Sequence, residues 1–318
     1  ILLRADSIPF NIEAKKILLV RFDERVGNLI MLTPLIQTLT EKLPNATVDL
    51  LCNQRSYTLL SNFDSINQVH LFNKRAIFNK LGPFGILFLL RRSRYDLVVD
   101  LSNPTDPSIT QAIMVRLSNA KYTIGSNSRG YGKLFNAGVD IDRSHDIHEI
   151  DLRMQLLKPL SATLNINYNS NDVPTVMPKL KEIPHPKTVS TLLSFYSDKI
   201  DNSPYLLINV GARLPEKRLT AEKWCEIITQ LTKTYREQKN ITKKQYKILI
   251  VWGPGEIELA KSISDKTPNT ILAPPTNLNE LMALIANASA TITCDTGPMH
   301  MSVASEVPTC AIFVISSP

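Results

Sequence analysis

Asp295, Thr296, Gly297 and His300 lie where an apolar run, residues 290–294, gives way to a helical pattern. The first N–H groups of a helix lack partners within it and lie at the positive end of its dipole, so this junction could bind an anion. Gly297 would let a diphosphate approach the backbone, and His300 could donate a hydrogen bond to it. A capped strand-to-helix turn with a structural histidine is the simpler interpretation.

A basic loop follows another apolar run, residues 205–209. It contains Gly211, Arg213 and Lys217, and its cations could offset the charge that builds on a diphosphate leaving group. A solvent-exposed basic turn would have the same composition. We expect the next helix to begin after Thr220, which would be its N-cap.

Trp252, Gly253 and Glu256 follow a third apolar run. The Glu256 carboxylate could accept hydrogen bonds from the hydroxyls of a ribose. A carboxylate at this point also favours a helix N-terminus without any ligand. The pattern by itself therefore leaves nucleoside binding and a simple turn both open.

The first half of the chain offers Gly27, which follows the apolar run 17–22 and could bring a second ligand close to a helix N-terminus. The further glycines of a dinucleotide-binding fingerprint are missing. Basic residues cluster at positions 74–75, at Arg91, Arg92 and Arg94, and at 129–133. Such clusters are usually solvated, but they could also line a groove for an anionic sugar or contact anionic lipid.

Metal-binding patterns are weak. His145 and His148 lie three residues apart without further ligands nearby, and no Asp-x-Asp pair accompanies the proposed phosphate loops, so we predict no metal site. The cysteines stand singly within apolar runs, at Cys52, Cys225, Cys294 and Cys310. This spacing predicts reduced core residues in a cytosolic protein.

The elements that would position these residues form two series of alternating strands and helices. Strands are expected at 17–22, 47–51, 68–72, 97–101 and 122–124, and then at 205–209, 246–252, 270–272, 290–293 and 309–313. This alternation predicts an α/β protein with doubly wound parallel sheets. A proline-rich linker, 171–187, would join an N-terminal domain, 1–170, to a C-terminal domain, 188–318. Ligands would bind in a central cleft, beyond the carboxyl ends of the strands.

Composition is that of a folded globular protein of 318 residues, with 43% hydrophobic and 20% charged residues. No apolar run approaches the roughly 20 residues of a membrane-spanning helix, and we find no secretory signal. The net charge of +7 predicts attraction to an anionic partner. A phosphorylated substrate and a membrane surface both fit, whereas no nucleic-acid-binding motif is present.

These segments together resemble the bacterial heptosyltransferases of glycosyltransferase family 9, over nearly the whole chain. The similarity rests on residues 16–21 leading to Gly27, on 32–35, on 211–217 followed by Trp224, on 252–253, and on 295–300. It implies a GT-B fold, in which two Rossmann-like domains face a central cleft. The C-terminal domain would bind a nucleotide sugar, usually ADP-L-glycero-D-manno-heptose, and the N-terminal domain a lipid-linked acceptor.

The resemblance also assigns roles to residues. Lys217 corresponds to a phosphate-contacting lysine that assists departure of the diphosphate. The implied donor-binding residues are Gly211, Arg213, Lys217, Trp252, Gly253, Glu256, Asp295, Thr296, Gly297 and His300. The expected acceptor-binding residues are Gly27, Arg91, Arg92 and Arg94. Neither a metal nor another cofactor is expected.

Asn28 departs from the family, which usually has an aspartate there as the general base. An amide has no useful basicity near neutral pH. We predict that Asp23 takes the proton instead; an impaired enzyme or a different acceptor are the alternatives.

The function predicted from the sequence is inverting transfer of a heptose, or a related sugar, from ADP-heptose to lipopolysaccharide core or a related surface glycan. The enzyme would be cytoplasmic and peripheral to the inner membrane, without a nucleic-acid partner. A nucleotide-sugar 2-epimerase and a non-catalytic sugar-nucleotide binder are the alternatives. A periplasmic binding protein is disfavoured because no export signal was found.

Overall fold

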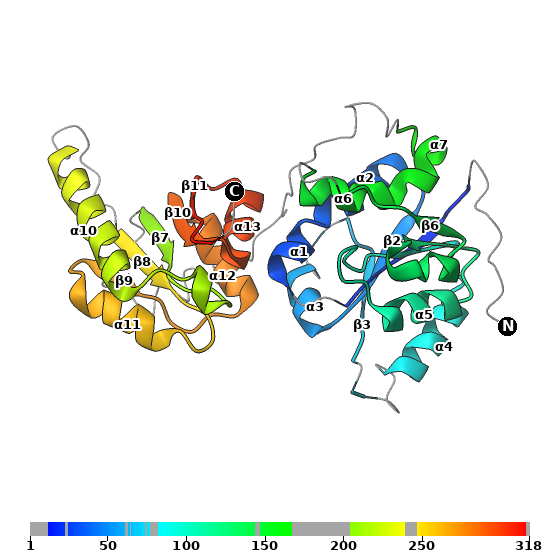
Figure 1. Ribbon diagram of the computed structural model, residues 1–318, viewed down its shortest axis with the longest axis horizontal. Coiled ribbons are helices and arrows are strands. Elements are labelled where there is room, and N and C mark those ends of the chain that lie inside the picture. The colour runs from blue at the N-terminus through cyan, green and yellow to red at the C-terminus, as the bar shows by residue number, and fades with distance from the viewer. Residues whose placement is uncertain are drawn as a thin grey trace. The chain divides into compact units, whose positions relative to one another are not determined.

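The computed structural model describes residues 12–22, 25–60, 63, 65–73, 75–76, 82–143, 147–166, 204–238 and 247–315. Contacts divide the chain into two compact units, Ile1–Pro178 and Lys179–Pro318. Each unit is built around one parallel sheet (Figure 1). The expected linker, 171–187, lies outside the described residues, so its boundaries remain a prediction.

The N-terminal unit has a six-stranded sheet in the order β3-β2-β1-β4-β5-β6. Its strands are β1 Lys16–Arg21, β2 Thr47–Cys52, β3 Gln68–Leu71, β4 Leu97–Asp100, β5 Tyr122–Ser126 and β6 Ala137–Val139. Its helices are α1 Val26–Ile30, α2 Thr33–Lys42, α3 Gln54–Leu60, α4 Pro83–Ser93, α5 Ile109–Leu117, η1 Ser128–Leu134, α6 Glu149–Met154, η2 Gln155–Leu160 and α7 Ser161–Leu164.

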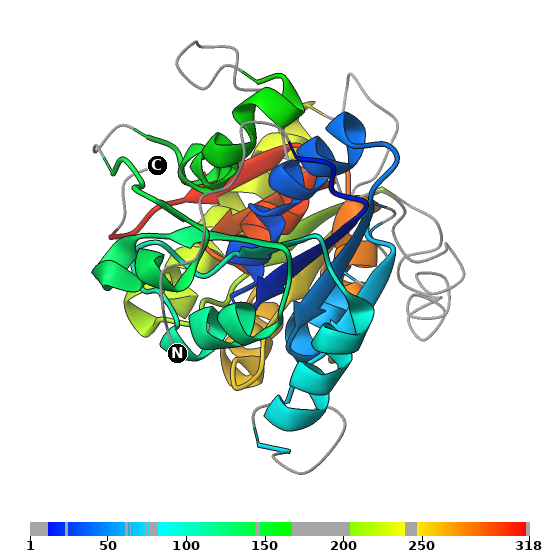
Figure 2. The ribbon, with the colours of Figure 1, turned by 90° about the vertical axis from the view of Figure 1, so that its right-hand side faces the viewer.

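Helices α4 and α5 cover one face of this sheet and contact each other (Figure 2). Ile86 and Leu90, one turn apart on α4, pack with Ala112 of α5 against Leu18 and Val98 of the sheet. Strands covered on both faces bury alternate residues on each side, which is why their sequences are almost continuously apolar.

The C-terminal unit has a five-stranded sheet in the order β11-β10-β7-β8-β9. Its elements are β7 Tyr205–Asn209, η3 Pro215–Lys217, α10 Ala221–Gln238, β8 Lys247–Val251, α11 Ile257–Lys266, β9 Thr270–Leu272, α12 Leu278–Ala286, β10 Ala290–Cys294, α13 Gly297–Ala304 and β11 Thr309–Ile312. Trp224 on α10 is fully buried and packs with Ile208 and Ile250. No helix in the described part of the chain is long and apolar enough to cross a bilayer.

The predicted strands are all present, with ends shifted by at most two residues, and both sheets are parallel. β6 was missed because only three residues, one of them glycine, form it. The prediction for the cysteines was wrong in part. Cys52 and Cys294 are buried, but Cys225 is half-buried and Cys310 is exposed on the edge strand β11, where a side chain has no neighbouring strand on one side.

Candidate functional site

Three predicted loops of the C-terminal unit follow the neighbouring strands β10, β7 and β8. Because these strands are parallel, their carboxyl ends share one edge of the sheet. β7 is the first strand among the described residues of this unit, and later strands add on both sides of it. The edge beside β7 and β10 is therefore a topological switch point, where α/β proteins usually bind ligands.

Lys217 and Asp295 join two of these loops. The lysine ends η3, the aspartate follows β10, and the two side chains form an ion pair. Their exposed fractions are 26% and 19%, so the pair is largely shielded from water. The predicted basic loop and the predicted helix junction are thus one site.

The start of α13 has the geometry expected for anion binding. Thr296 is the N-cap with an extended backbone, and its side chain makes no capping hydrogen bond to the helix. Its hydroxyl donates to the carbonyl oxygen of Cys294 instead, at 3.2 Å. The first turn contains no acidic residue and includes both Gly297 and His300. The first turn itself therefore has no carboxylate to offset the positive end of the helix, and Asp295, which precedes the N-cap, pairs with Lys217.

Asn209 holds this junction together, and sequence reasoning missed it. The side chain is buried at the end of β7, and its amide nitrogen lies 3.0 Å from both the Gly211 carbonyl oxygen and the Thr293 hydroxyl. The Thr296 hydroxyl is 3.4 Å away. A polar residue ending an otherwise apolar strand was the signal available in the sequence.

Glu256 links the loops after β7 and β8. Its side chain is 7% exposed. One carboxylate oxygen accepts from the backbone N–H of Gly253 at 2.7 Å, and the other lies 3.1 Å from the Arg218 guanidinium. A Cβ placed on Gly211 would lie 1.6 Å from this carboxylate. Both oxygens thus have partners within the unit, so Glu256 positions the loops; direct contact with a nucleoside remains a prediction.

Two further predicted donor residues lie beside these loops. Trp252 is half-buried, and its indole N–H donates to the carbonyl oxygen of Ala273 at 3.0 Å, which fixes the ring at the end of β8. Arg213 is exposed. The Arg213 side chain can therefore reach a ligand, whereas the polar group of Trp252 is already engaged.

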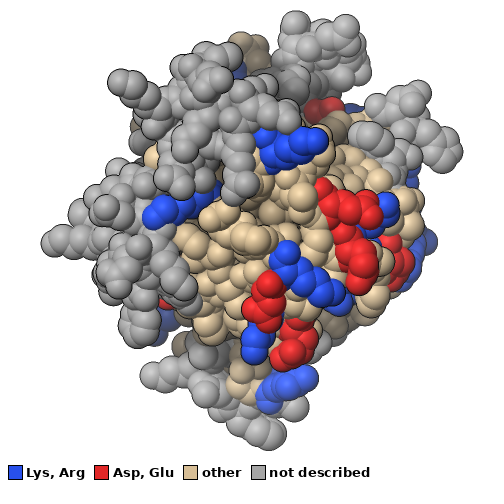
Figure 3. All heavy atoms as spheres, turned by 90° about the vertical axis from the view of Figure 1, so that its left-hand side faces the viewer, with Lys and Arg blue, Asp and Glu red and all other residues tan. Residues whose placement is uncertain are grey.

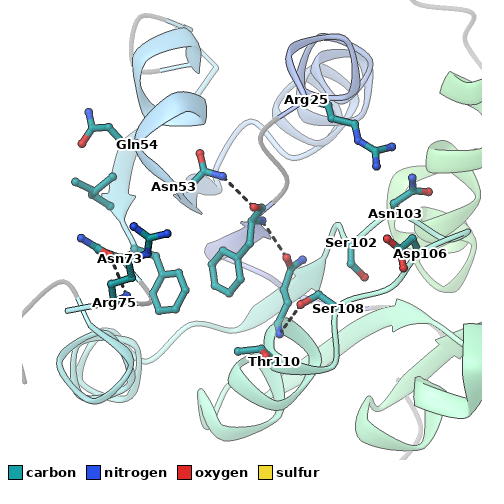
Figure 4. A pocket seen from close by; sticks show the side chains of 14 residues that line it. Arg25, Asn53, Gln54, Asn73, Arg75, Ser102, Asn103, Asp106, Ser108 and Thr110 are labelled. Atoms are coloured by element: carbon teal, nitrogen blue, oxygen red, sulfur yellow. Dashed lines mark hydrogen bonds between the residues drawn. The ribbon is translucent and has the colours of Figure 1, made fainter. Parts of the chain in front are cut away.

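The N-terminal unit has its own pocket, of about 800 Å³, at the carboxyl ends of β1 to β4 (Figure 4). Two cations, Arg25 and Arg75, stand on different sides of it. Asp106 is the acidic residue among the described residues that line it. The remaining polar lining consists of Asn53, Gln54, Asn73, Ser102, Asn103, Ser108, Thr110 and Gln111.

Gln111 joins the ends of β1 and β4 at the base of this pocket by hydrogen bonds. The side chain accepts from the Phe22 backbone N–H at 3.0 Å and donates to the Val20 carbonyl oxygen at 2.7 Å. It also donates to Asp100 at the end of β4. Burial raises the pKa of Asp100 to about 6, although hydrogen bonds from Ser102 and Gln111 act in the opposite direction. The switch point between β1 and β4 is therefore fixed by buried polar groups.

Asn28 lies on α1 next to the predicted Gly27. The carboxamide oxygen of Asn28 accepts from the Arg153 guanidinium at 3.2 Å. Arg153 is almost fully buried and also pairs with Glu149. Asp23, the predicted substitute base, lies outside the described residues.

Arg91, Arg92 and Arg94, which were expected to bind the acceptor, are not brought together with Gly27. They end α4 and lead into the start of β4, at the amino edge of the sheet. Gly27 and the pocket lie at the opposite, carboxyl edge, because each helix of a parallel α/β fold returns the chain to where the next strand begins. Arg91 instead donates to the Leu117 carbonyl oxygen at 2.9 Å.

Within the described ranges, no three His, Cys, Asp or Glu side chains are grouped as metal ligands would be. His148 caps α6 by accepting from the Ile150 backbone N–H at 3.2 Å. His145 lies outside those ranges.

The chain is similar in sequence to known proteins. A sequence model of glycosyltransferase family 9 (heptosyltransferase) matches residues 88–318. Lipopolysaccharide heptosyltransferase 3 of Escherichia coli strain K12 is 26% identical over 309 residues, which cover 90% of this chain and 79% of that protein.

Solved structures are similar as well. The E. coli ADP-heptose lipopolysaccharide heptosyltransferase II superposes with a TM-score of 0.74 at 20% identity, covering 93% of this chain and 84% of that one. The E. coli heptosyltransferase WaaC with ADP gives 0.69 at 18% identity, covering 95% and 88%. These similarities confirm the predicted GT-B fold class.

Proposed function

Because this chain belongs to glycosyltransferase family 9, we propose that it transfers a heptose from ADP-heptose to lipopolysaccharide core or a related surface glycan. The observation that carries the proposal is the ion pair between Lys217 and Asp295 at the start of α13. It places a cation beside a helix N-terminus at the switch point of the C-terminal sheet, where a diphosphate can be bound. The relatives named above as ADP-heptose and ADP-containing enzymes support this choice of donor.

The donor diphosphate is proposed to lie against the backbone of Thr296 and Gly297. Lys217 and His300 would flank it. A helix N-terminus and a held ammonium group favour negative charge, and that charge increases on the diphosphate as the sugar departs. Asp295 keeps the lysine in position rather than touching the donor itself.

The acceptor is proposed to occupy the pocket of the N-terminal unit. A volume of about 800 Å³ falls within the range of small-ligand sites. Arg25 and Arg75 would bind phosphate or carboxylate groups of an anionic sugar, since guanidinium groups pair with both. This role replaces the one expected for Arg91, Arg92 and Arg94.

The proposed reaction is a single displacement with inversion. The acceptor hydroxyl attacks the anomeric carbon, the bond from that carbon to the diphosphate oxygen breaks, and ADP leaves with the electron pair. Asp23 takes the hydroxyl proton. Lys217 and the start of α13 balance the charge on ADP, so the proposed mechanism uses neither a metal nor another cofactor.

A non-catalytic sugar-nucleotide binder is the second candidate, and Asn28 favours it. The amide oxygen of Asn28 already accepts a hydrogen bond from Arg153, and an amide cannot take up a proton near neutral pH. The donor site would then be intact while transfer is lost.

One assay separates these functions. The protein is incubated with ADP-heptose, with and without heptose-deficient lipopolysaccharide, and ADP is quantified. We expect ADP release that requires the acceptor. Donor binding without ADP release would support the non-catalytic binder, and conversion of the sugar without acceptor would indicate an epimerase.

A further inference from the structure

Phe84 and Phe88 are the most exposed large apolar side chains in the described part of the chain, at 68% and 69%. They lie four residues apart on α4 and therefore share one face of the helix. Ile86 and Leu90 on the same helix are buried against the sheet. Helix α4 thus has two apolar faces, and the sheet accounts for only one.

Helix α5 repeats the pattern. Ile109, Ile113 and Leu117 follow one another at intervals of four residues, and they are 43%, 43% and 39% exposed. The two helices lie side by side (Figure 2), and the hydrogen bond from Arg91 to Leu117 joins their C-terminal ends. The exposed apolar residues therefore form one surface, the α4–α5 surface, made of Phe84, Phe88, Ile109, Ile113 and Leu117.

The charged side chains on these two helices have one sign. Neither helix contains an aspartate or glutamate, while α4 ends with Arg91 and Arg92 and Arg94 follows it. By contrast, acidic and basic side chains are interspersed on the face of the C-terminal unit that Figure 3 shows. Helices that combine exposed apolar side chains with cations and carry no acids are typical of segments that lie in the interface of an anionic bilayer.

We propose that the α4–α5 surface docks the protein on an anionic lipid bilayer. The inference deepens the proposed function, because it rests on the acceptor being lipid-linked. Phenylalanine and isoleucine side chains would enter the boundary of the acyl chains, and Arg91, Arg92 and Arg94 would meet phosphate head groups. A second copy of the chain fits less well, since it would bring arginines together without any carboxylate on either helix to pair with them.

The position of the pocket supports this orientation. Ser108 and Thr110 line the pocket, and the exposed Ile109 lies between them. The N-terminal end of α5 thus belongs to both the pocket and the α4–α5 surface, so docking through α5 would hold the pocket close to the bilayer.

Vesicle co-sedimentation tests the proposal. The full chain is mixed with vesicles of phosphatidylethanolamine and phosphatidylglycerol, or with neutral phosphatidylcholine vesicles. We expect binding to the anionic vesicles that weakens at 1 M salt. Phe84→Ser/Phe88→Ser and Arg91→Glu/Arg92→Glu should each weaken it at least about tenfold. Two controls in the other unit should bind as the wild type does. Ile315→Ser removes an exposed apolar side chain there. Lys233→Glu/Lys261→Glu changes the net charge as much as Arg91→Glu/Arg92→Glu does.

Undiminished vesicle binding by both α4 double variants would overturn the proposal. So would absence of vesicle binding by the wild type together with a change of oligomeric state in Phe84→Ser/Phe88→Ser, measured by light scattering, because the surface would then bind protein.

A second experiment distinguishes failure of docking from failure of the proposed function. It compares the rate of sugar transfer to an acceptor embedded in vesicles with the rate of transfer to the delipidated oligosaccharide of the same acceptor. Slower transfer by Phe84→Ser/Phe88→Ser to the embedded acceptor alone supports docking. Equal loss on both acceptors counts against it. Vesicle binding that depends on Phe84 in a protein without transferase activity would leave docking supported and the proposed function refuted.

Discussion

Lys217 and Asp295 are 78 residues apart in the chain, yet their side chains form an ion pair at the carboxyl edge of the C-terminal sheet. The pairing follows from topology, because β7 and β10 are neighbouring parallel strands and the two residues lie in the segments after them. Each segment alone matches an ordinary turn. Together they place an ammonium group beside the first turn of α13, which is an arrangement suited to phosphate.

Replacing Lys217 tests this arrangement. We expect Lys217→Ala to weaken ADP binding about tenfold to a hundredfold, because a hydrogen bond to a charged group contributes about 1.5–3 kcal/mol. Isothermal titration calorimetry measures the change. Lys223→Ala serves as a control, since it removes the same charge from the exposed pair with Glu226 on α10. Wild-type affinity in Lys217→Ala would contradict the proposed diphosphate position.

Because Gly211 has no side chain, the Glu256 carboxylate can contact both the loop after β7 and the loop after β8. In Gly211→Ala the new Cβ would lie 1.6 Å from the carboxylate, which must move away from Gly253 and Arg218. We expect a loss of about 2–3 kcal/mol in unfolding free energy, measured by urea denaturation.

A double variant separates this clash from other effects. Gly211→Ala/Glu256→Ala should be no less stable than Glu256→Ala, because the clash is then gone. Gly255→Ala is the control; it meets no atom within 4 Å, but its φ of +82° should cost about 1 kcal/mol. Additive losses in the double variant would count against this role of Gly211.

The sequence was sufficient for the strands other than β6 and for the positions of the three C-terminal loops, because buried parallel strands are continuous apolar runs and the loops follow them directly. It was not sufficient for Asn209, Gln111 and Arg153, whose partners lie far away in the chain. The location of Arg91, Arg92 and Arg94 could not be predicted from the sequence either. Their charge was evident, but only the position of α4 in the sheet order shows that they lie away from the pocket.

The raised pKa of Asp100 predicts that the free energy of unfolding depends on pH in a specific range. Its folded pKa of about 6 exceeds its unfolded value of 3.8, so the native state binds the additional proton between those values. Its contribution to stability is fully present below the unfolded pKa and is lost as the pH rises through 6. Between pH 5 and pH 7.5 this should lower the unfolding free energy by about 1 kcal/mol.

Asp100→Asn should abolish this part of the pH dependence. Urea unfolding followed by circular dichroism at both pH values measures it. The slope with pH is the readout, because the substitution also removes a charge near the buried Arg21. Tryptophan fluorescence reports on the C-terminal unit, because Trp224 and Trp252 both lie there. It is therefore an internal control for a change at Asp100, which lies in the N-terminal unit. Identical pH slopes in the two proteins would show that Asp100 is not the group responsible.

Asp23 is the predicted general base. Asp23→Ala should reduce acceptor-dependent ADP release about 10²- to 10⁴-fold, the usual contribution of such a group. The affinity for ADP, measured by calorimetry, should stay unchanged because the donor residues lie in the other unit. Full transferase activity in this variant would remove Asp23 from the mechanism.

Asn28→Asp gives the sharpest test of the catalytic assignment. A carboxylate at this position would accept a charge-assisted hydrogen bond from the buried Arg153, so we expect stability to rise by about 1 kcal/mol at pH 7. The gain should disappear as the pH falls and the new carboxylate takes up a proton. Asn119→Asp, at an exposed residue, introduces the same charge elsewhere and is the control.

The same carboxylate should also act as a base, since it can take a proton that the amide of Asn28 cannot. We therefore expect Asp23→Ala/Asn28→Asp to recover at least about tenfold of the ADP release lost in Asp23→Ala. Because the recovered reaction depends on a different carboxylate, its rate should also change with pH differently from that of the wild type. A double variant that binds ADP normally but stays as inactive as Asp23→Ala would place the acceptor hydroxyl away from α1.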